Sequence, residues 1–300
     1  MITVFGRNYY GNSYACVSNG YAAKFDGIND FAVLTGTGIV PTYAAEKVLY
    51  SMWLKVDDLT SPNASYFFYS QQANGNTNDF WRIFYTPKNS SGSAINRLGV
   101  EWRANGTSNN IQKQYELHGN SGITGSVSST SYWNASNSNI NTNQNGYVHL
   151  TVIFDLPGIG SAMSTGGVDV FWNGQLLTNP VVNQTNGTSQ TSIPAGSLNR
   201  YLAVNGSNNT GFFNGKIDEL FILNGSALST WLTNTGLTTN QQIANHLYNG
   251  DCPVTIVQDG RWEFGWSRFE NNWDLGGANP SASYGGWNPV NGATFSTDQA

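Results

Sequence analysis

The sequence predicts an all-β protein in which two antiparallel sheets pack face to face. Short segments of alternating apolar and polar residues recur along the 300 residues, and this alternation is typical of half-buried strands. Loops rich in Asn, Ser and Gly separate these segments, and a single short amphipathic helix is expected late in the chain. Many short strands with one late helix favour a two-sheet antiparallel sandwich.

The clearest strand is predicted over residues 147–155. Its even-numbered residues, from Val148 to Phe154, would face the core, while His149 and the other odd-numbered residues would face the opposite way. A second strand, 167–172, runs into Asn173-Gly174, a pair that tolerates positive φ and predicts a type I′ hairpin returning over 175–177. The remaining strands are expected at residues 48–56, 80–85, 97–102, 200–204 and 216–222, with a further candidate at 254–257.

One helix is predicted over residues 241–248. Thr239 or Asn240 would cap its N-terminus, and Gly250 stands where a left-handed residue commonly ends a helix. The longest connection, 119–146, is almost entirely Ser, Asn, Thr and Gly, and a loop of this length in a compact domain is usually functional or mobile.

The composition is that of a folded domain with an uncharged polar surface. Only 10% of the residues are charged and 13% are aromatic, whereas disordered chains combine low hydrophobicity with high net charge. The net charge of −5 and the 13 scattered Lys and Arg residues predict no nucleic-acid partner. No apolar run is long enough to span a bilayer, so no membrane insertion is expected. We expect no signal peptide, although a new initiator Met could have replaced one.

The two cysteines, Cys16 and Cys252, flank the predicted domain. They could be two free buried thiols or a disulfide that joins the entry and exit of the domain, and the sequence leaves both open.

Three segments, at residues 25–31, 172–175 and 215–222, resemble parts of the laminin-G-like, concanavalin A-like jelly-roll domains. Residues 25–31 (Phe-Asp-Gly-Ile-Asn-Asp-Phe) resemble the opening motif, and 172–175 resemble the central hairpin. The run 215–222, followed by 227–229 and 247–248, is similar to the closing strand, loop and helix. The resemblance covers about residues 21–250 and implies a jelly roll in which the strands near residues 25 and 218 are neighbours.

This reading divides the chain into an N-terminal arm (1–20), the jelly roll (21–250) and a C-terminal extension (251–300). The extension begins near Pro253 and is rich in Trp and Gly. We interpret it as an assembly or docking segment and predict that residues 1–252 fold without it but no longer assemble. Its candidate partner-binding or glycan-binding residues are Trp262, Trp266, Trp273 and Trp287.

The segments 268–272 and 291–298 are similar to the ends of laminin-G-like proteins encoded by tailed bacteriophages. This resemblance implies a non-enzymatic virion surface protein: a capsid decoration protein, a head fibre or a tail-associated adhesin. It would be assembled in the host cytoplasm, form a homo-oligomer, and bind other virion proteins and host surface glycans. The alternative is a secreted, extracellular or cell-surface carbohydrate-binding module.

A glycoside hydrolase is the least favoured function. Such enzymes need two carboxylates facing one cleft. The adjacent pair Asp57-Asp58 would instead point to opposite faces at a strand end or lie in a turn, and the adjacent pair Asp218-Glu219 would point to opposite faces of a strand.

Asp26 and Asp218 are the candidate metal ligands. If the first and last strands are neighbours, the two carboxylates could meet and hold Ca²⁺, which prefers oxygen ligands. The alternative is structural: Asp26 would cap a turn with Gly27, and Asp218 would accept backbone N–H groups. If calcium is bound, a chelator should lower the melting temperature. No other cofactor is expected.

Trp133 is the aromatic residue whose role is most open. Trp residues on the alternating strands are expected in the core. Trp133 lies instead in the polar 119–146 loop, where it could be a sugar platform, a partner anchor or a plug that holds the loop.

Overall fold

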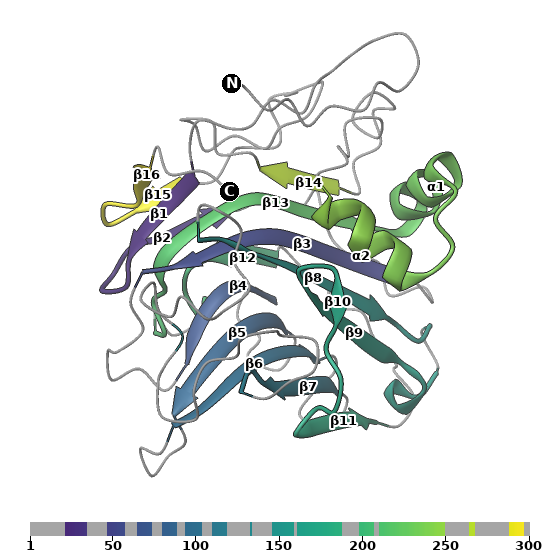
Figure 1. Cartoon of the computed structure of the whole chain (residues 1–300). Coiled ribbons are helices and arrows are strands. Elements are labelled where there is room, and N and C mark those ends of the chain that lie inside the picture. Colours follow the sequence, from purple (N-terminus) through teal and green to yellow (C-terminus); the bar gives the residue numbers. More distant parts are fainter. Residues whose placement is uncertain are drawn as a thin grey trace, which may run out of the picture.

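The predicted β-sandwich is confirmed by the structure, a computed structural model (Figure 1). Two eight-stranded antiparallel sheets pack face to face. The first has the order β10-β9-β8-β3-β13-β1-β16, with β14 also paired to β13, and the second has the order β11-β7-β6-β5-β4-β12-β2-β15. The structure describes residues 22–34, 47–57, 65–73, 80–88, 94–103, 110–118, 133, 146–158, 161–187, 198–206, 210–249, 264–267 and 288–296.

The strands of the first sheet are β1 (Ala22–Asp26), β3 (Lys47–Val56), β8 (Val148–Asp155), β9 (Gly167–Trp172), β10 (Gln175–Leu176), β13 (Asn214–Asn224), β14 (Phe264–Ser267) and β16 (Thr294–Ser296). The strands of the second sheet are β2 (Phe31–Leu34), β4 (Tyr66–Ala73), β5 (Phe80–Lys88), β6 (Ala94–Arg103), β7 (Asn110–Glu116), β11 (Val182–Asn186), β12 (Leu198–Leu202) and β15 (Asn288–Val290).

The pairing of β1 with β13 confirms that the two ends of the jelly roll are neighbours. The strands are antiparallel, with Ala23 opposite Ile217 and Phe25 opposite Gly215. After β1 the chain turns and enters β2, which belongs to the other sheet. The opening motif therefore links the two layers.

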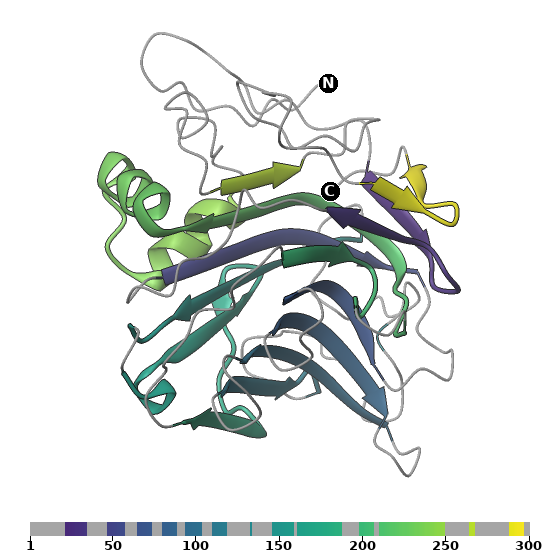
Figure 2. The ribbon, with the colours of Figure 1, turned by 180° about the vertical axis from the view of Figure 1, so that it is seen from behind.

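The core lies between the sheets. As predicted, Val148 and Phe154 of β8 face it, together with the fully buried Trp81, Trp102 and Trp172. The opposite side of β8 is also buried, because Ile153 packs in a second apolar cluster beneath the helices. The helices cover the outer face of the first sheet near one end of β13 (Figure 2).

Two α-helices lie within the described residues, and the sequence predicted one of them. The predicted helix is α2 (Asn240–Tyr248), and Thr239 and Gln242 form its capping box. The other, α1 (Gly225–Thr235), directly follows β13 and buries Leu228 and Trp231. A short 3-10 helix, η1, spans Met163–Thr165. No helix among the described residues has the length and apolar character that crossing a membrane requires.

The hairpin predicted at Asn173-Gly174 joins β9 to β10. Asn173 has φ 48° and Gly174 has φ 76°, as a type I′ turn requires. Gln175 pairs opposite Trp172, so this prediction is confirmed.

Parts of the C-terminal extension belong to the sandwich. β14 pairs with β13, β15 with β2, and β16 with β1, so this extension contributes strands to both sheets. Trp266 lies in β14 opposite Phe221. The N-terminal arm, Cys16, Cys252, the candidate strand 254–257, Gly250, Trp262, Trp273 and Trp287 lie outside the described residues.

We expect deletion of residues 253–300 to destabilise the sandwich, because it exposes backbone groups of three strands that are now paired. The melting temperature should fall by at least about 5 °C, which corresponds to roughly 3 kcal/mol in a chain of this size. Circular dichroism measures the melting temperature, and deletion of residues 297–300 alone serves as the control. An unchanged melting temperature would show that β14, β15 and β16 contribute nothing to stability.

Candidate functional site

Two rows of side chains, all but one of them able to form hydrogen bonds, cross the outer face of the second sheet. The sheet register aligns residues from six neighbouring strands, while the residues between them in β5, β6 and β7, which are Trp81, Trp102 and Ile111, point into the core. We call this set the polar face. In strand order from β12 to β11, its first row is Asn199, Gln72, Phe80, Arg103, Asn110 and Asn186, and its second row is Tyr201, Ser70, Arg82, Glu101, Gln112 and Gln184.

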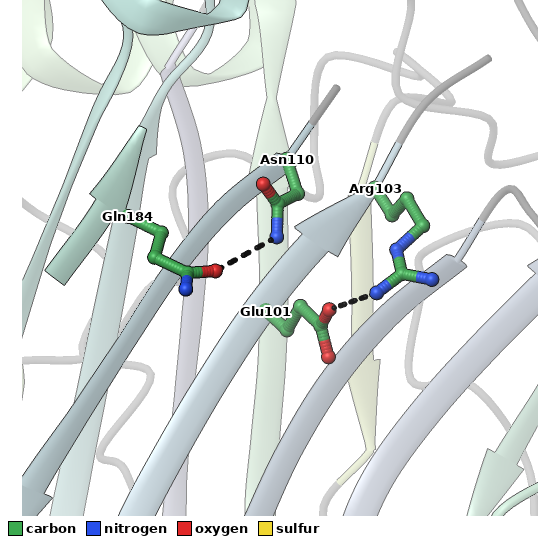
Figure 3. A network of polar contacts seen from close by, with 4 residues as sticks. All are labelled: Glu101, Arg103, Asn110 and Gln184. Atoms are coloured by element: carbon green, nitrogen blue, oxygen red, sulfur yellow. Dashed lines mark hydrogen bonds and ion pairs between the residues drawn. The ribbon is translucent and has the colours of Figure 1, made fainter. Parts of the chain in front are cut away.

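Polar contacts hold part of this face in place (Figure 3). Arg103 Nη2 lies 2.9 Å from Glu101 Oε1, and the two residues occupy alternate positions of β6. Asn110 Nδ2 donates to Gln184 Oε1 over 3.4 Å and so links β7 to β11. Glu101 is only 5% exposed, so its carboxylate is committed to Arg103.

Two arginines lie against one aromatic ring. The Cζ atoms of Arg82 and Arg103 lie 3.6 Å and 4.7 Å from the centroid of Phe80. Arg82 also lies 5.8 Å from the ring of Phe67. Burial lowers the pKa of the Arg82 guanidinium, Glu101 raises it, and Arg103 lowers it. These cation–π contacts fix the positions of both guanidinium groups.

The ring of Tyr201 rests on backbone at one end of the second row. A Cβ placed on Gly206 would stand 2.1 Å from the Tyr201 ring, so only glycine leaves room for this ring. Ser70, the next residue in the row, accepts the N–H of Gly206 over 3.0 Å and donates to the carbonyl of Val204 over 2.8 Å. Tyr201 is partly exposed and thus presents aromatic surface beside polar groups.

A buried Ser–His pair lies on the outer face of the first sheet. Ser51 Oγ and His149 Nε2 are 2.8 Å apart, a distance that suits a nucleophile and its base. However, Ser51 is 3% and His149 2% exposed, and the rings of Trp53 and Tyr248 lie 4.8 Å and 5.9 Å from His149. The pair is therefore part of the packing beneath α2.

Asp26 and Asp218 do not meet, so the calcium site predicted between them is wrong. Asp26 pairs opposite Asn214 of β13. Asp218 lies four residues further along that strand, which corresponds to about 13 Å. The sequence placed the right strands side by side, but it did not fix the positions of the carboxylates along them.

The structural role of both aspartates is confirmed. Asp26 accepts the N–H of Ile28 over 2.8 Å and caps a turn in which Gly27 has φ 77°. Asp218 is 1% exposed, and its Oδ1 accepts the N–H of Glu219 over 2.8 Å. Within the described part of the chain, no group of three or more His, Cys, Asp or Glu residues could hold a metal ion. Calcium binding elsewhere stays a prediction, which melting with and without a chelator tests.

Trp133 is a core residue. It is 3% exposed, and its ring lies 5.1 Å from Trp172, 5.7 Å from Tyr85 and 5.9 Å from Phe68. Its backbone N–H donates to Tyr85 Oη over 3.0 Å. The predictions of a sugar platform or a partner anchor are therefore wrong, because no ring face is open, and the structure supports the third alternative, a plug.

Comparisons with known proteins show the fold. No family model and no curated protein matches the chain. Among solved structures, a Bacteroides ovatus protein described as carbohydrate-binding matches with a TM-score of 0.50 at 13% identity, over 95% of this chain and 62% of that one. The CBM40 of Ruminococcus gnavus IT-sialidase matches with a TM-score of 0.33 at 16% identity, over 58% and 74%. Tailspike protein 2 of Escherichia coli O157:H7 bacteriophage CAB120 matches with a TM-score of 0.38 at 10% identity, over 77% and 29%. At these identities, the likeness to the Bacteroides ovatus protein shows a shared β-sandwich.

We expect the free energy of unfolding to decrease as the pH is lowered, because the imidazole of His149 is buried. Burial lowers the pKa of His149 from 6.5 to about 3, so the unfolded chain takes up this proton at a higher pH than the folded chain. Its contribution to stability is complete above pH 6.5 and is lost as the pH falls toward 3. The loss is at most about 1.4 kcal/mol per pH unit.

Urea unfolding at several pH values measures this effect. The His149→Asn variant should show a flatter pH profile, whereas the control Ile28→Ala, which changes an exposed residue that has no titratable group, should keep the slope of the original chain. Parallel pH profiles for His149→Asn and the original chain would show that His149 does not cause the loss of stability at low pH.

We expect Trp133→Ala to lower the free energy of unfolding by about 3–5 kcal/mol, because it leaves a cavity among buried rings. Trp133→Phe should cost less, because part of the ring contact remains. Urea unfolding measures both variants, and a loss below about 1 kcal/mol for Trp133→Ala would show that the loop is not held by this residue.

Proposed function

We propose that the chain is a non-enzymatic carbohydrate-binding protein and that the polar face binds sugars. The observation that carries the proposal is the double row aligned across six strands, in which six of the twelve side chains are amides and two are guanidinium groups. Sugar hydroxyls both donate and accept hydrogen bonds, and Asn and Gln side chains do the same. Rows held by a sheet present these groups at fixed spacing, which reduces the entropy lost on binding.

Tyr201 supplies the aromatic component of the proposed site. One face of a sugar ring is mostly C–H and packs on aromatic surface, while the hydroxyls at its edge need polar partners. Phe80 is 3% exposed beneath two guanidiniums, so Tyr201 is the better platform. A sugar on its ring would have the amides of Gln72 and Asn199, in the neighbouring row, within reach.

The carboxylates of this face favour binding over cleavage. Glycoside hydrolysis by the usual mechanisms needs two carboxyl groups on opposite sides of the scissile bond. Among the twelve residues of the polar face, Glu101 is the one carboxylate, and it is paired with Arg103. The Bacteroides ovatus protein described as carbohydrate-binding has this fold, with which the proposal is compatible.

The virion role is a second part of the proposal. It is supported by the resemblance of segments 268–272 and 291–298 to the ends of phage-encoded laminin-G-like proteins. A sugar-binding face on a capsid decoration protein, head fibre or tail-associated adhesin would attach the particle to host glycans, while other surfaces contact virion partners or further copies of the chain. Co-purification with phage particles tests this location. A chain recovered only as a free extracellular monomer would favour the secreted module.

We expect Tyr201→Ala to weaken glycan binding about tenfold, the equivalent of the roughly 1.4 kcal/mol that an aromatic contact contributes. Tyr201→Phe keeps the ring and should bind within about threefold of the original chain. A glycan array identifies ligands, and calorimetry on the best of them measures the affinity.

The control for this experiment is Ile28→Ala, which changes an exposed apolar residue, 74% accessible, in the β1–β2 turn. Its affinity should match that of the original chain. The proposed function is wrong if the chain binds no glycan on the array, and the placement of the site is wrong if Tyr201→Ala binds as tightly as the original chain.

A further inference from the structure

Arg82 has a charge that no described residue neutralises by contact. Arg103 is paired with Glu101 at 2.9 Å, and Arg97, just outside the polar face, is paired with Glu116 at 3.4 Å. Arg82 is half-buried and has ring contacts, but it has no hydrogen bond or ion pair within the described part of the chain. Its guanidinium therefore has donors available for a ligand.

The position of Arg82 is central in the polar face. It lies in the second row between Ser70 of β4 and Glu101 of β6. Its Cζ atom, 3.6 Å from the Phe80 centroid, is held close to that ring, which occupies the alternate position of the same strand. A held guanidinium loses less conformational entropy on binding than a free one.

The charge balance of this face differs from that of the whole chain. The chain has a net charge of −5, yet the polar face carries two arginines and one glutamate. Since Glu101 is already paired, one positive charge remains for the ligand. A guanidinium presents a planar fork of donors that matches a planar carboxylate in a bidentate arrangement.

We propose that the ligand of the polar face is an acidic sugar whose carboxylate binds Arg82. This inference rests on the proposed function and assigns its ligand to the carboxylated sugars, such as sialic and uronic acids. The carboxylate would lie on the Arg82 fork between Ser70 and Glu101. Gln112 and Gln184, which continue the same row, would then receive the hydroxyls of that sugar or of the next one.

The test compares matched ligands on the full chain. Oligosaccharides ending in sialic or glucuronic acid are paired with the same oligosaccharides after chemical reduction of the carboxyl group to an alcohol, which removes the charge but keeps the ring. The original chain should bind the acidic member at least about tenfold more tightly, the lower range for a charge-assisted bidentate contact. This preference should decrease as salt is added.

Variants then locate the contact. In Arg82→Gln the ratio between the acidic and the reduced ligand should fall toward one, and Arg82→Lys, which keeps the charge without the fork, should be intermediate. Arg97→Gln removes a neighbouring arginine that is already paired, so it should keep the full preference. Melting curves check that each variant is folded, and the comparison of ligands on the original chain needs no variant.

Each outcome has one meaning. Equal binding of acidic and reduced ligands would leave the proposed function intact and overturn the acidic-sugar inference. A preference for sulfated ligands over carboxylated ones would overturn the carboxylate assignment, and a preference that survives Arg82→Gln would overturn the role of Arg82. Absence of binding to any glycan would overturn the proposed function itself.

Discussion

The pairing of β13 with its three neighbours is the constraint on which the rest of the structure depends. β13 pairs along its length with β3, with β1 over its first half and with β14 over its second half. The register against β3 shifts between Asp218 and Phe221, where Glu219 has φ 49°, so a bulge divides the strand. The buried Asp218 carboxylate accepts the N–H of Glu219 and stabilises this bulge. Asp218 thus stabilises the backbone of β13, whereas the sequence analysis considered it as a metal ligand.

The same strand determines which outer face can bind a ligand. Because β13 leads directly into α1, the two helices are placed on the outer face of the first sheet, where they bury Phe221, Ile153 and Ser51. Side chains that could carry out chemistry on that face, such as His149, are closed off. The outer face of the second sheet carries the two polar rows instead. The connection between β13 and α1 therefore determines that helices cover the outer face of the first sheet, while the outer face of the second sheet carries the polar rows.

The sequence predicted what depends on local pattern. Alternation located β8, β9 and β13, and the Asn-Gly turn and the capping box identified a hairpin and α2. The helix α1 was missed because its Ser, Thr and Asn residues are poor helix formers, and packing of Leu228 and Trp231 overrides that preference. The sequence left the role of Trp133 open between a sugar platform, a partner anchor and a plug, because a polar loop says little about the burial of one large ring. The polar face could not be predicted, since the register of six strands brings its residues into rows.

Two arginines of the second sheet show how position decides the role of a charge. Arg200, on the core side, is 2% exposed and is hydrogen-bonded to Tyr69, and burial lowers the pKa of its guanidinium. It is shielded from any ligand and serves the packing of the sheets. Arg82 belongs to the same sheet but points outward, against Phe80, with part of its surface accessible. Burial of the Arg82 guanidinium costs stability that the attraction of Glu101 offsets only in part, and such costs in folded proteins are concentrated at functional sites. Ligand recognition is therefore expected at Arg82 and not at Arg200.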